Sequence, residues 1–343
     1  MNGHTATLLD PPSTTPTPPI AVTLAGGAPP TNGVIGHAEV NGVTKHLGTN
    51  GRVSRAAGDD TRILVSADGT QIYVNAVGDP SKQAIVFIHG IVWSLMAFDD
   101  IFCDPDWTSR LYLVRYDVRG HGRSGKPSAD EGWASERFAE DFGAVVDAFK
   151  LEKPIVAGWS LGATHLVDIL SAYPVDYLRG IINISGITYI DDTVLDRFGT
   201  PGSLEWIGQM AGSPNVEEFQ AGAVNFIDGC CRTLPYEVRR ACLGNIMTQP
   251  QSIILRSLTR KQNVETFGNV GRTMLPCLVI YGDSDELIAV HKLPEYHKEW
   301  RNVTVEVVEG GSHVPWSKTA ERPAALFKEK ALRWVDSVME SRL

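Results

Sequence analysis

Several features that direct proteins to membranes or nucleic acids are missing from this sequence. No apolar run approaches the roughly 18 residues that a bilayer-spanning helix needs. No Lys or Arg occurs before Lys45, so the positively charged start of a secretory signal peptide is absent as well. The net charge is −9, and no cluster of basic residues with interleaved aromatics occurs. We therefore expect neither a membrane span nor a nucleic-acid partner.

The sequence is also poor in cysteine, which argues against zinc and dithiol redox sites. Its five cysteines are irregularly spaced, and no CxxC motif occurs among them: Cys103, Cys230, Cys231, Cys242 and Cys277. Zinc ribbons and thioredoxin-like sites both depend on that motif. We interpret these residues as reduced thiols of an intracellular protein. The sequence implies neither a metal nor an organic cofactor.

Residues 1–57 differ in composition from the rest of the chain. Pro, Gly, Thr and Asn dominate this segment, and no hydrophobic period is sustained in it. Such a segment cannot bury enough apolar surface to offset the entropy that it would lose on ordering. We expect a disordered or loosely attached tail, with at most one short strand near Val53.

Regular structure is expected from about residue 58 onward. Residues 61–66 and 71–77 are typical of two strands joined by a tight turn, which predicts a hairpin. Residues 84–88 form a continuous apolar run, as expected of a strand that is buried on both faces of a parallel sheet. Similar runs follow at 111–114, 154–157, 180–184, 277–281 and 303–308.

Helical patterns separate these strands. Apolar residues recur at helical spacing within residues 138–149 and 326–339. The alternation of strands and helices predicts a doubly wound, mostly parallel α/β sheet. Residues 187–270 interrupt this alternation and are helical in tendency. We expect them to form a cap over the carboxyl edge of the sheet, with residues 58–186 and 271–343 as the core.

The strongest motif is Gly158-Trp159-Ser160-Leu161-Gly162, which fits the pattern G-x-S-x-G. A strand is predicted directly before it and a helix directly after it, which is the context of a nucleophile elbow. In such a turn a strained serine projects its hydroxyl above the sheet, and the flanking glycines avoid collisions. The N–H of Leu161 then points to where an oxyanion would form. An ordinary turn is the alternative, but this context favours Ser160 as a nucleophile.

A serine hydroxyl needs a base to become a nucleophile, and His313 is the candidate. It follows the last predicted strand, and open α/β sheets form their active sites in loops at the carboxyl ends of strands. The other histidines are expected in the tail, at structural positions or on the surface. His291 and His297 in particular are predicted to lie on a helix and to face solvent.

The base in turn needs an acid that fixes its tautomer. Asp283 and Asp285 both follow the predicted strand 277–281, and either gives the chain order Ser, Asp, His. We choose Asp285, because it lies further along the loop, where a carboxylate can reach His313. Asp283 is interpreted as a turn residue that hydrogen-bonds nearby backbone.

A second oxyanion donor is expected from the loop that follows residues 84–88. This loop begins His89-Gly90-Ile91, and Gly90 allows a close approach of the backbone. The N–H of Ile91 is therefore the second candidate donor. His89 is interpreted as a residue that orients the loop, not as a second base.

These motifs together resemble the α/β-hydrolase superfamily, in its form with an inserted cap, over residues 61 to about 340. The matching segments are His89-Gly90, residues 117–124, the G-x-S-x-G motif, residues 282–285 and Ser312-His313. In that family the aspartate three residues after the glycine of the seventh-strand loop is the catalytic acid, which supports Asp285. The loop 119–124 is structural there, so no chemistry is assigned to His121. Haloalkane dehalogenases and epoxide hydrolases have Asp as nucleophile, a mechanism that Ser160 excludes.

The resemblance implies acyl transfer from a small carbonyl substrate to water through Ser160, His313 and Asp285. An ester is the first choice, and carbon–carbon bond hydrolysis or an acyl-CoA thioester remains an alternative on the same residues. A receptor that binds a small molecule without turnover is a third possibility. Trp93 and Trp159 are candidates for an apolar substrate pocket, together with the cap aromatics Phe198, Trp206, Phe219 and Phe226. Ordinary core packing is the alternative for each.

The sequence ends in Ser341-Arg342-Leu343, which resembles the peroxisomal address S-K-L with its charge kept. The helix predicted before it would leave this tripeptide exposed to an import receptor. We therefore expect import into the peroxisome, with the cytoplasm as the alternative location.

Overall fold

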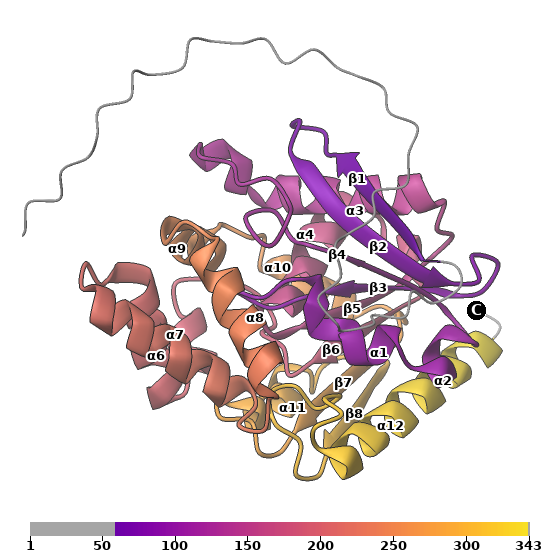
Figure 1. Cartoon of the computed structure of the whole chain (residues 1–343). Coiled ribbons are helices and arrows are strands. Elements are labelled where there is room, and N and C mark those ends of the chain that lie inside the picture. Colours follow the sequence, from indigo (N-terminus) through magenta and orange to yellow (C-terminus); the bar gives the residue numbers. More distant parts are fainter. Residues whose placement is uncertain (1–58, 342–343) are drawn as a thin grey trace, which may run out of the picture. The chain divides into compact units, whose positions relative to one another are not determined.

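The computed structural model of the chain describes residues 59–341 (Figure 1). The predicted tail, residues 1–57, and the short strand near Val53 lie outside the described residues, as do Arg342 and Leu343. No helix in the described part of the chain is long and apolar enough to cross a membrane.

The core is an eight-stranded sheet in the order β1-β2-β4-β3-β5-β6-β7-β8. Its strands are β1 (Asp60–Val65), β2 (Gln71–Gly78), β3 (Ala84–Ile88), β4 (Tyr112–Tyr116), β5 (Ile155–Trp159), β6 (Gly180–Ile184), β7 (Cys277–Gly282) and β8 (Val303–Val308). The predicted hairpin is confirmed, since β1 pairs with β2 in antiparallel fashion, and β2 is also antiparallel to β4. The strands from β3 onward pair in parallel. Every residue of β3 to β7 is buried, as their continuous apolar runs predict.

Helices cover both faces of this sheet, which confirms the predicted doubly wound α/β fold (Figure 1). One layer contains α1 (Asp99–Phe102), α2 (Pro105–Thr108) and the C-terminal α12 (Glu321–Glu340). Trp107 of α2 stacks on Phe327 of α12 and meets Phe87 of β3 edge-on. The other layer contains α3 (Ser135–Phe149) and α4 (His165–Ala172), which pack against each other.

Six α-helices lie between β6 and β7 in the described structure, where residues 187–270 were predicted to form a cap. They are α5 (Val194–Phe198), α6 (Pro201–Gly212), α7 (Val216–Cys230), α8 (Tyr236–Met247), α9 (Ser252–Thr259) and α10 (Glu265–Gly271). Local sequence starts two of them: Thr200 and Ser203 form a capping box on α6, and Asn215 caps α7. The last helix, α10, packs against α4 of the core.

The position predicted for His297 is wrong, whereas His291 is exposed as expected. His297 is 1% exposed and packs between the rings of Phe267 and Trp300. Its Nδ1–H donates to the carbonyl of Leu293 at 2.8 Å, and burial lowers the pKa of the imidazole to about 4. The error has a simple cause: this part of the chain is a short 3₁₀ turn followed by a four-residue helix, which no periodic pattern reveals.

Candidate active site

Ser160 lies at the sharp turn between β5 and the 3₁₀ helix Ser160–Thr164. Its φ of 55° lies in the left-handed region, which non-glycine residues rarely adopt and which recurs at functional sites. Glycine is required on both sides of the turn. A Cβ on Gly158 would lie 2.4 Å from the Cα of Ala163, and one on Gly162 would lie 2.3 Å from the carbonyl oxygen of Ile88. The turn therefore holds the serine in a strained conformation, as the motif predicts.

The loop after β3 packs directly on this serine. Strands β3 and β5 are neighbours, with Ile88 paired to Gly158, so their following loops leave the same edge of the sheet. A Cβ on Gly90 would lie only 2.9 Å from the Cβ of Ser160. The next residue, Ile91, lines the same cavity as Ser160. Ile91 and Leu161, the two residues whose N–H groups were predicted as oxyanion donors, thus both lie beside Ser160.

His89 has the orienting role in this loop that the sequence suggested. Its Nδ1–H donates to the carbonyl of Gly90 at 2.7 Å, and its Nε2 accepts from the N–H of Val118 at 3.0 Å. Complete burial lowers the pKa of His89 to about 4, so the ring is neutral and both nitrogens are used. His121 packs edge-on against it and is buried as well.

The candidate acid and base lie on two adjacent loops further along the sheet, beyond β6. Asp285 follows β7 and His313 follows β8, and these strands are parallel neighbours. The Nδ1–H of His313 donates to Oδ2 of Asp285 at 2.7 Å, and both side chains are buried, at 1% and 0% exposed. Oδ1 of Asp285 accepts the backbone N–H groups of Leu287 and Ile288, each at 2.9 Å. The carboxylate is therefore fixed on both oxygens.

Asp283, the other candidate acid, does not contact His313 in this way. It is exposed, and its Oδ1 accepts the N–H of Gly310 at 2.8 Å and the hydroxyl of Ser284 at 3.1 Å. Its contacts are those of a turn residue that ties the loop after β7 to the loop after β8. The geometry supports the choice of Asp285 as the partner of His313.

An apolar cavity of about 30 Å³ opens on Ser160. The loops of the core and the helices of the cap both line it: Ile91, Leu161, Ile187, Val194, Leu195, Phe198, Gly199, Ser203, Ile207, Phe226, Leu258, Leu287 and Ile288. No charged side chain is among them. The hydroxyl of Ser203 is engaged in the capping box of α6, so it is not free to bind a ligand.

The two tryptophans proposed for a pocket do not line this cavity. Trp159 is 0% exposed, and its Nε1–H donates to the carbonyl of His313 at 2.8 Å. Trp93 is buried and meets Trp159 edge-on. Trp159 thus packs against the loop of His313. The aromatic residues that line the cavity with Ser160 are Phe198 and Phe226, both from the cap. The sequence pattern could not distinguish these roles, because both sets are large apolar residues.

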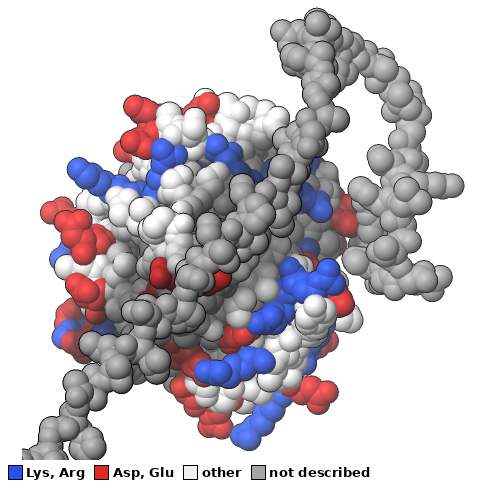
Figure 2. Space-filling model, turned by 60° about the vertical axis from the view of Figure 1, so that its left-hand side comes forward, with Lys and Arg blue, Asp and Glu red and all other residues white. Residues whose placement is uncertain are grey.

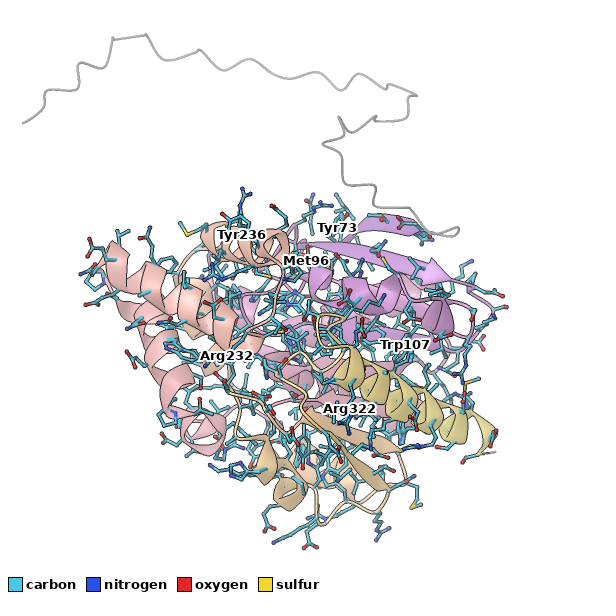
Figure 3. All side chains as sticks on the ribbon, turned by 60° about the horizontal axis from the view of Figure 1, so that its bottom comes forward. Tyr73, Met96, Trp107, Arg232, Tyr236 and Arg322 are labelled. Carbon is cyan, nitrogen blue, oxygen red and sulfur yellow. The ribbon has the colours of Figure 1, made fainter. Side chains whose placement is uncertain are left out.

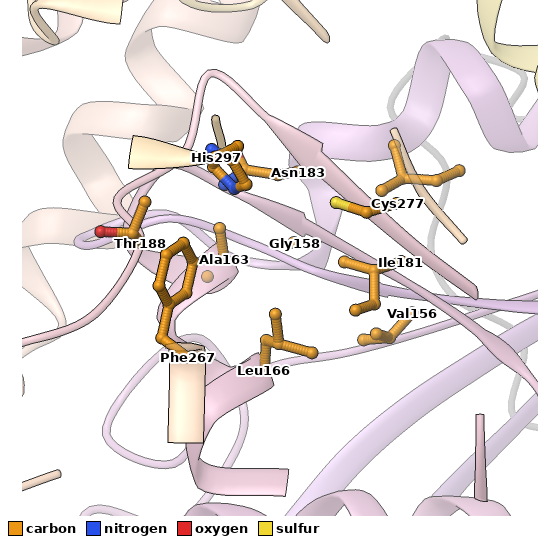
Figure 4. Close-up of a pocket in the computed structure, with 12 residues that line it drawn as sticks. Val156, Gly158, Ala163, Leu166, Ile181, Asn183, Thr188, Phe267, Cys277 and His297 are labelled. Carbon is orange, nitrogen blue, oxygen red and sulfur yellow. The ribbon is translucent and has the colours of Figure 1, made fainter. Parts of the chain in front are cut away.

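A second cavity, of about 10 Å³, lies behind the serine turn, between Gly158, Ala163, Asn183 and His297 (Figure 4). This volume is about the minimum that holds one water molecule. Asn183 already uses its side-chain oxygen to accept the N–H of Gly186. Cys277 and Thr188 also line it, and burial raises the pKa of the Cys277 thiol well above its usual range, so the cavity offers no thiolate.

Charged side chains lie beside the loop of Asp285. Arg232, which follows α7 and is labelled in Figure 3, forms two hydrogen bonds to Glu286, the residue after Asp285, at 2.7 and 2.5 Å. Both side chains are exposed, so this ion pair contributes little to stability. On the face shown in Figure 2, acidic and basic side chains are interspersed rather than gathered by sign. Within the described residues, no group of three or more His, Cys, Asp or Glu side chains is arranged to hold a metal ion.

Comparison with known proteins agrees with the fold. The sequence model of the alpha/beta hydrolase family matches residues 85–329 of this chain. A mycobacterial protein named "Probable oxidoreductase EphD", from Mycobacterium tuberculosis, is 34% identical over 78 residues, which are 23% of this chain and 13% of that protein. The chain thus spans only a small fraction of the relative that it matches.

Solved structures extend the similarity over most of the described chain. The esterase RhEst1 from Rhodococcus sp. ECU1013 has a TM-score of 0.67 at 22% identity, covering 79% of this chain and 98% of its own. A bromoperoxidase from Bacillus anthracis has a TM-score of 0.64 at 18% identity, covering 81% and 100%. At these identities the structures establish a shared fold. With the family match over more than half of its length, the chain belongs to the alpha/beta hydrolase family.

Proposed function

We propose that this hydrolase cleaves carboxylic esters through an acyl-enzyme on Ser160. The observation that carries the proposal is the strained Ser160 turn, which faces an uncharged cavity, together with the buried Asp285–His313 pair on the loops after β7 and β8. Nucleophile, base and orienting acid are the three roles that such a mechanism needs.

The chemistry follows from these positions. Ser160 Oγ attacks the ester carbonyl carbon while Nε2 of His313 takes its proton, and the N–H groups of Leu161 and Ile91 bind the developing oxyanion. The tetrahedral intermediate then expels the alcohol, which receives the proton from His313. Water attacks the acyl-enzyme with His313 again as base, releasing the acid and restoring the serine. Asp285 keeps the proton of the neutral imidazole on Nδ1, so that Nε2 is free to accept.

The alternatives are a carbon–carbon bond hydrolase or an acyl-CoA thioesterase on the same residues, and a non-catalytic receptor for a small molecule. A panel of substrates separates them. We expect the purified protein to hydrolyse p-nitrophenyl acetate faster than an acetyl-CoA thioester or a vinylogous diketone, with mass spectrometry showing a covalent fluorophosphonate adduct. Binding of these compounds without an adduct or turnover would favour the receptor.

The cavity also indicates which esters fit. Its volume of about 30 Å³ compares with roughly 10–15 Å³ for one water molecule. Only a short acyl group fits such a space without movement of the cap, and the absence of charged lining disfavours a carboxylate there. We therefore propose acetyl or propionyl esters as substrates, ahead of long-chain esters.

Phe226→Ala should shift this preference toward longer acyl chains. Phe226 of α7 lines the cavity and is 4% exposed, so its truncation opens space beside Ser160. Each methylene that an apolar pocket accepts or rejects changes kcat/KM by roughly 10-fold or more. We expect the ratio of kcat/KM for p-nitrophenyl hexanoate over acetate to rise at least about 10-fold.

The matched control is Phe219→Ala on the same helix, because Phe219 is only half-buried and does not line the cavity. Its chain-length preference should equal that of the wild type. A wild-type enzyme that already prefers long chains, or a Phe226→Ala variant with an unchanged ratio, would contradict the short-acyl proposal.

We also propose that the chain is imported into the peroxisome. Ser341 is exposed and directly follows α12, which supports an accessible C-terminal tripeptide. A fluorescent protein fused to the N-terminus should colocalise with a peroxisomal marker, and deletion of Leu343 should return it to the cytoplasm. Equal distributions with and without Leu343 would exclude this address.

A further inference from the structure

Two separate parts of the cap, its first residues and the segment between α9 and α10, contact the turn that carries Ser160. The first segment leaves β6, and there the N–H of Ile187 donates to the carbonyl of Ser160 at 3.0 Å. The second segment follows α9, and there Arg260 and Gln262 bond to Thr164, at the other end of the same 3₁₀ helix. The turn is therefore held by two parts of the cap that are far apart in the sequence.

The contact from Ile187 fixes one peptide plane. The carbonyl of Ser160 and the N–H of Leu161 belong to the same peptide group, and in a trans peptide they point in opposite directions. A hydrogen bond to the carbonyl therefore determines where the N–H points. This N–H is one of the two donors that the proposed mechanism directs at the oxyanion.

The contact from Arg260 acts on the next peptide. Its Nη2 donates to the hydroxyl oxygen of Thr164 at 2.5 Å, and that hydroxyl donates to the carbonyl of Leu161 at 2.7 Å. Gln262 Nε2 donates to the carbonyl of Thr164 at 2.8 Å. Leu161 is thus held on its N-terminal side through Ile187 and on its C-terminal side through Thr164.

Arg260 is itself fixed by a buried network. Its side chain and that of Asp168 are both 0% exposed, with Nη2 of Arg260 donating to Oδ2 of Asp168 at 2.9 Å. The other carboxylate oxygen accepts from Gln262 at 2.8 Å and from Ser135 at 2.6 Å. Ile190, at the start of the cap, donates its N–H to Oε1 of Gln262 at 2.7 Å. The two parts of the cap that contact the turn therefore meet in one set of hydrogen bonds.

Stability alone does not explain a buried ion pair of this kind. Removing two charges from water costs several kcal/mol per ion, and apolar side chains of similar volume are often as stabilising. Such a network does fix one geometry, because its shared donors and acceptors are all satisfied only when every member is in place. The geometry fixed here is that of the turn beside the nucleophile.

We propose that Arg260 is a positioning residue, which couples the seating of the cap to the orientation of the Leu161 N–H through Thr164. This inference rests on the proposed function, because that N–H matters for catalysis only if an oxyanion forms. Arg260 does not touch the substrate. When the cap is displaced, the support of the turn is lost, so the oxyanion site is complete only while the cap covers it.

Two variants test the coupling. Arg260→Met removes the donor to Thr164 but also leaves Asp168 with one fewer partner. Thr164→Val removes only the bridging hydroxyl and keeps the Arg260–Asp168 ion pair, so it decides the matter if Arg260→Met does not fold. The control is Arg256→Met: Arg256 lies on α9 and reaches Asp130 and the carbonyl of Pro127, away from the turn.

The readouts separate positioning from stability. A donor moved by a fraction of an ångström lowers kcat with little effect on ground-state binding. We expect kcat for p-nitrophenyl acetate to fall about 10- to 100-fold in Arg260→Met and Thr164→Val, with KM within about 3-fold. Hydrogen exchange of the segment 158–166 should be faster in both variants and unchanged in Arg256→Met.

Folded Thr164→Val protein with wild-type kcat and wild-type exchange would overturn the inference. A fall in thermal stability with unchanged kcat would reduce Arg260 to a structural role and overturn it as well. If the wild type hydrolyses no ester, the proposed function fails, and exchange of the segment 158–166 still decides whether the cap holds the turn.

Discussion

Ser160→Ala should lose ester hydrolysis almost completely, with kcat falling by about 10⁴- to 10⁶-fold. The large size of the effect follows from the proposed covalent step, since no other described side chain of the cavity offers a free hydroxyl or thiol. The variant keeps a Cβ in the same strained turn, so its fold should be unchanged. Labelling by a fluorophosphonate probe and turnover of p-nitrophenyl acetate measure the loss independently.

A matched control is Ser171→Ala, which removes an exposed serine of α4 whose hydroxyl bonds only to Thr266. It should retain labelling and full turnover. If Ser160→Ala protein still forms the covalent adduct, another residue is the nucleophile and the proposed mechanism is wrong.

The sequence predicts the strained turn at Ser160 and the pairing of Asp285 with His313, because both depend on local chemistry. The turn at Ser160 needs small residues at fixed offsets, and Gly158 and Gly162 supply them at two positions where a Cβ would collide with backbone. The buried strands are readable because both faces are covered, which leaves continuous apolar runs. Strand order then places the loops after β3 and β5 side by side, and likewise those after β7 and β8. The family resemblance adds the expectation that Asp285 is the acid.

The roles of residues in the cap and the pocket are much harder to predict from the sequence. Cap helices present apolar residues to the cavity, to one another and to the core, and composition does not tell these surfaces apart. The sequence therefore leaves pocket and core packing both open for Trp159 and Phe226; Trp159 bonds to the His313 loop, whereas Phe226 lines the cavity. The Arg260–Asp168 pair was missed for a related reason. The two residues are 92 positions apart, and neither lies in a local motif.

Asp285→Asn should lower kcat by about 10⁴-fold while leaving the fold intact. Oδ1 of Asp285 accepts two backbone N–H groups, so the asparagine oxygen must occupy that position. The amide NH₂ then faces Nδ1 of His313, which can only accept from it. That arrangement places the imidazole proton on Nε2, and the ring can no longer take the proton of Ser160.

Asp283→Asn provides the comparison, because the same substitution is made two residues earlier in the same loop. Asp283 is exposed and uses one oxygen to accept from Gly310, a bond that an amide oxygen can also accept. Its kcat should stay within about 2-fold of the wild type, as for other surface substitutions away from the site. The reverse result, with Asp283→Asn inactive and Asp285→Asn active, would transfer the acid role to Asp283. Equal activity in both variants would mean that His313 needs no carboxylate to hold its tautomer, and that the buried pair serves stability instead.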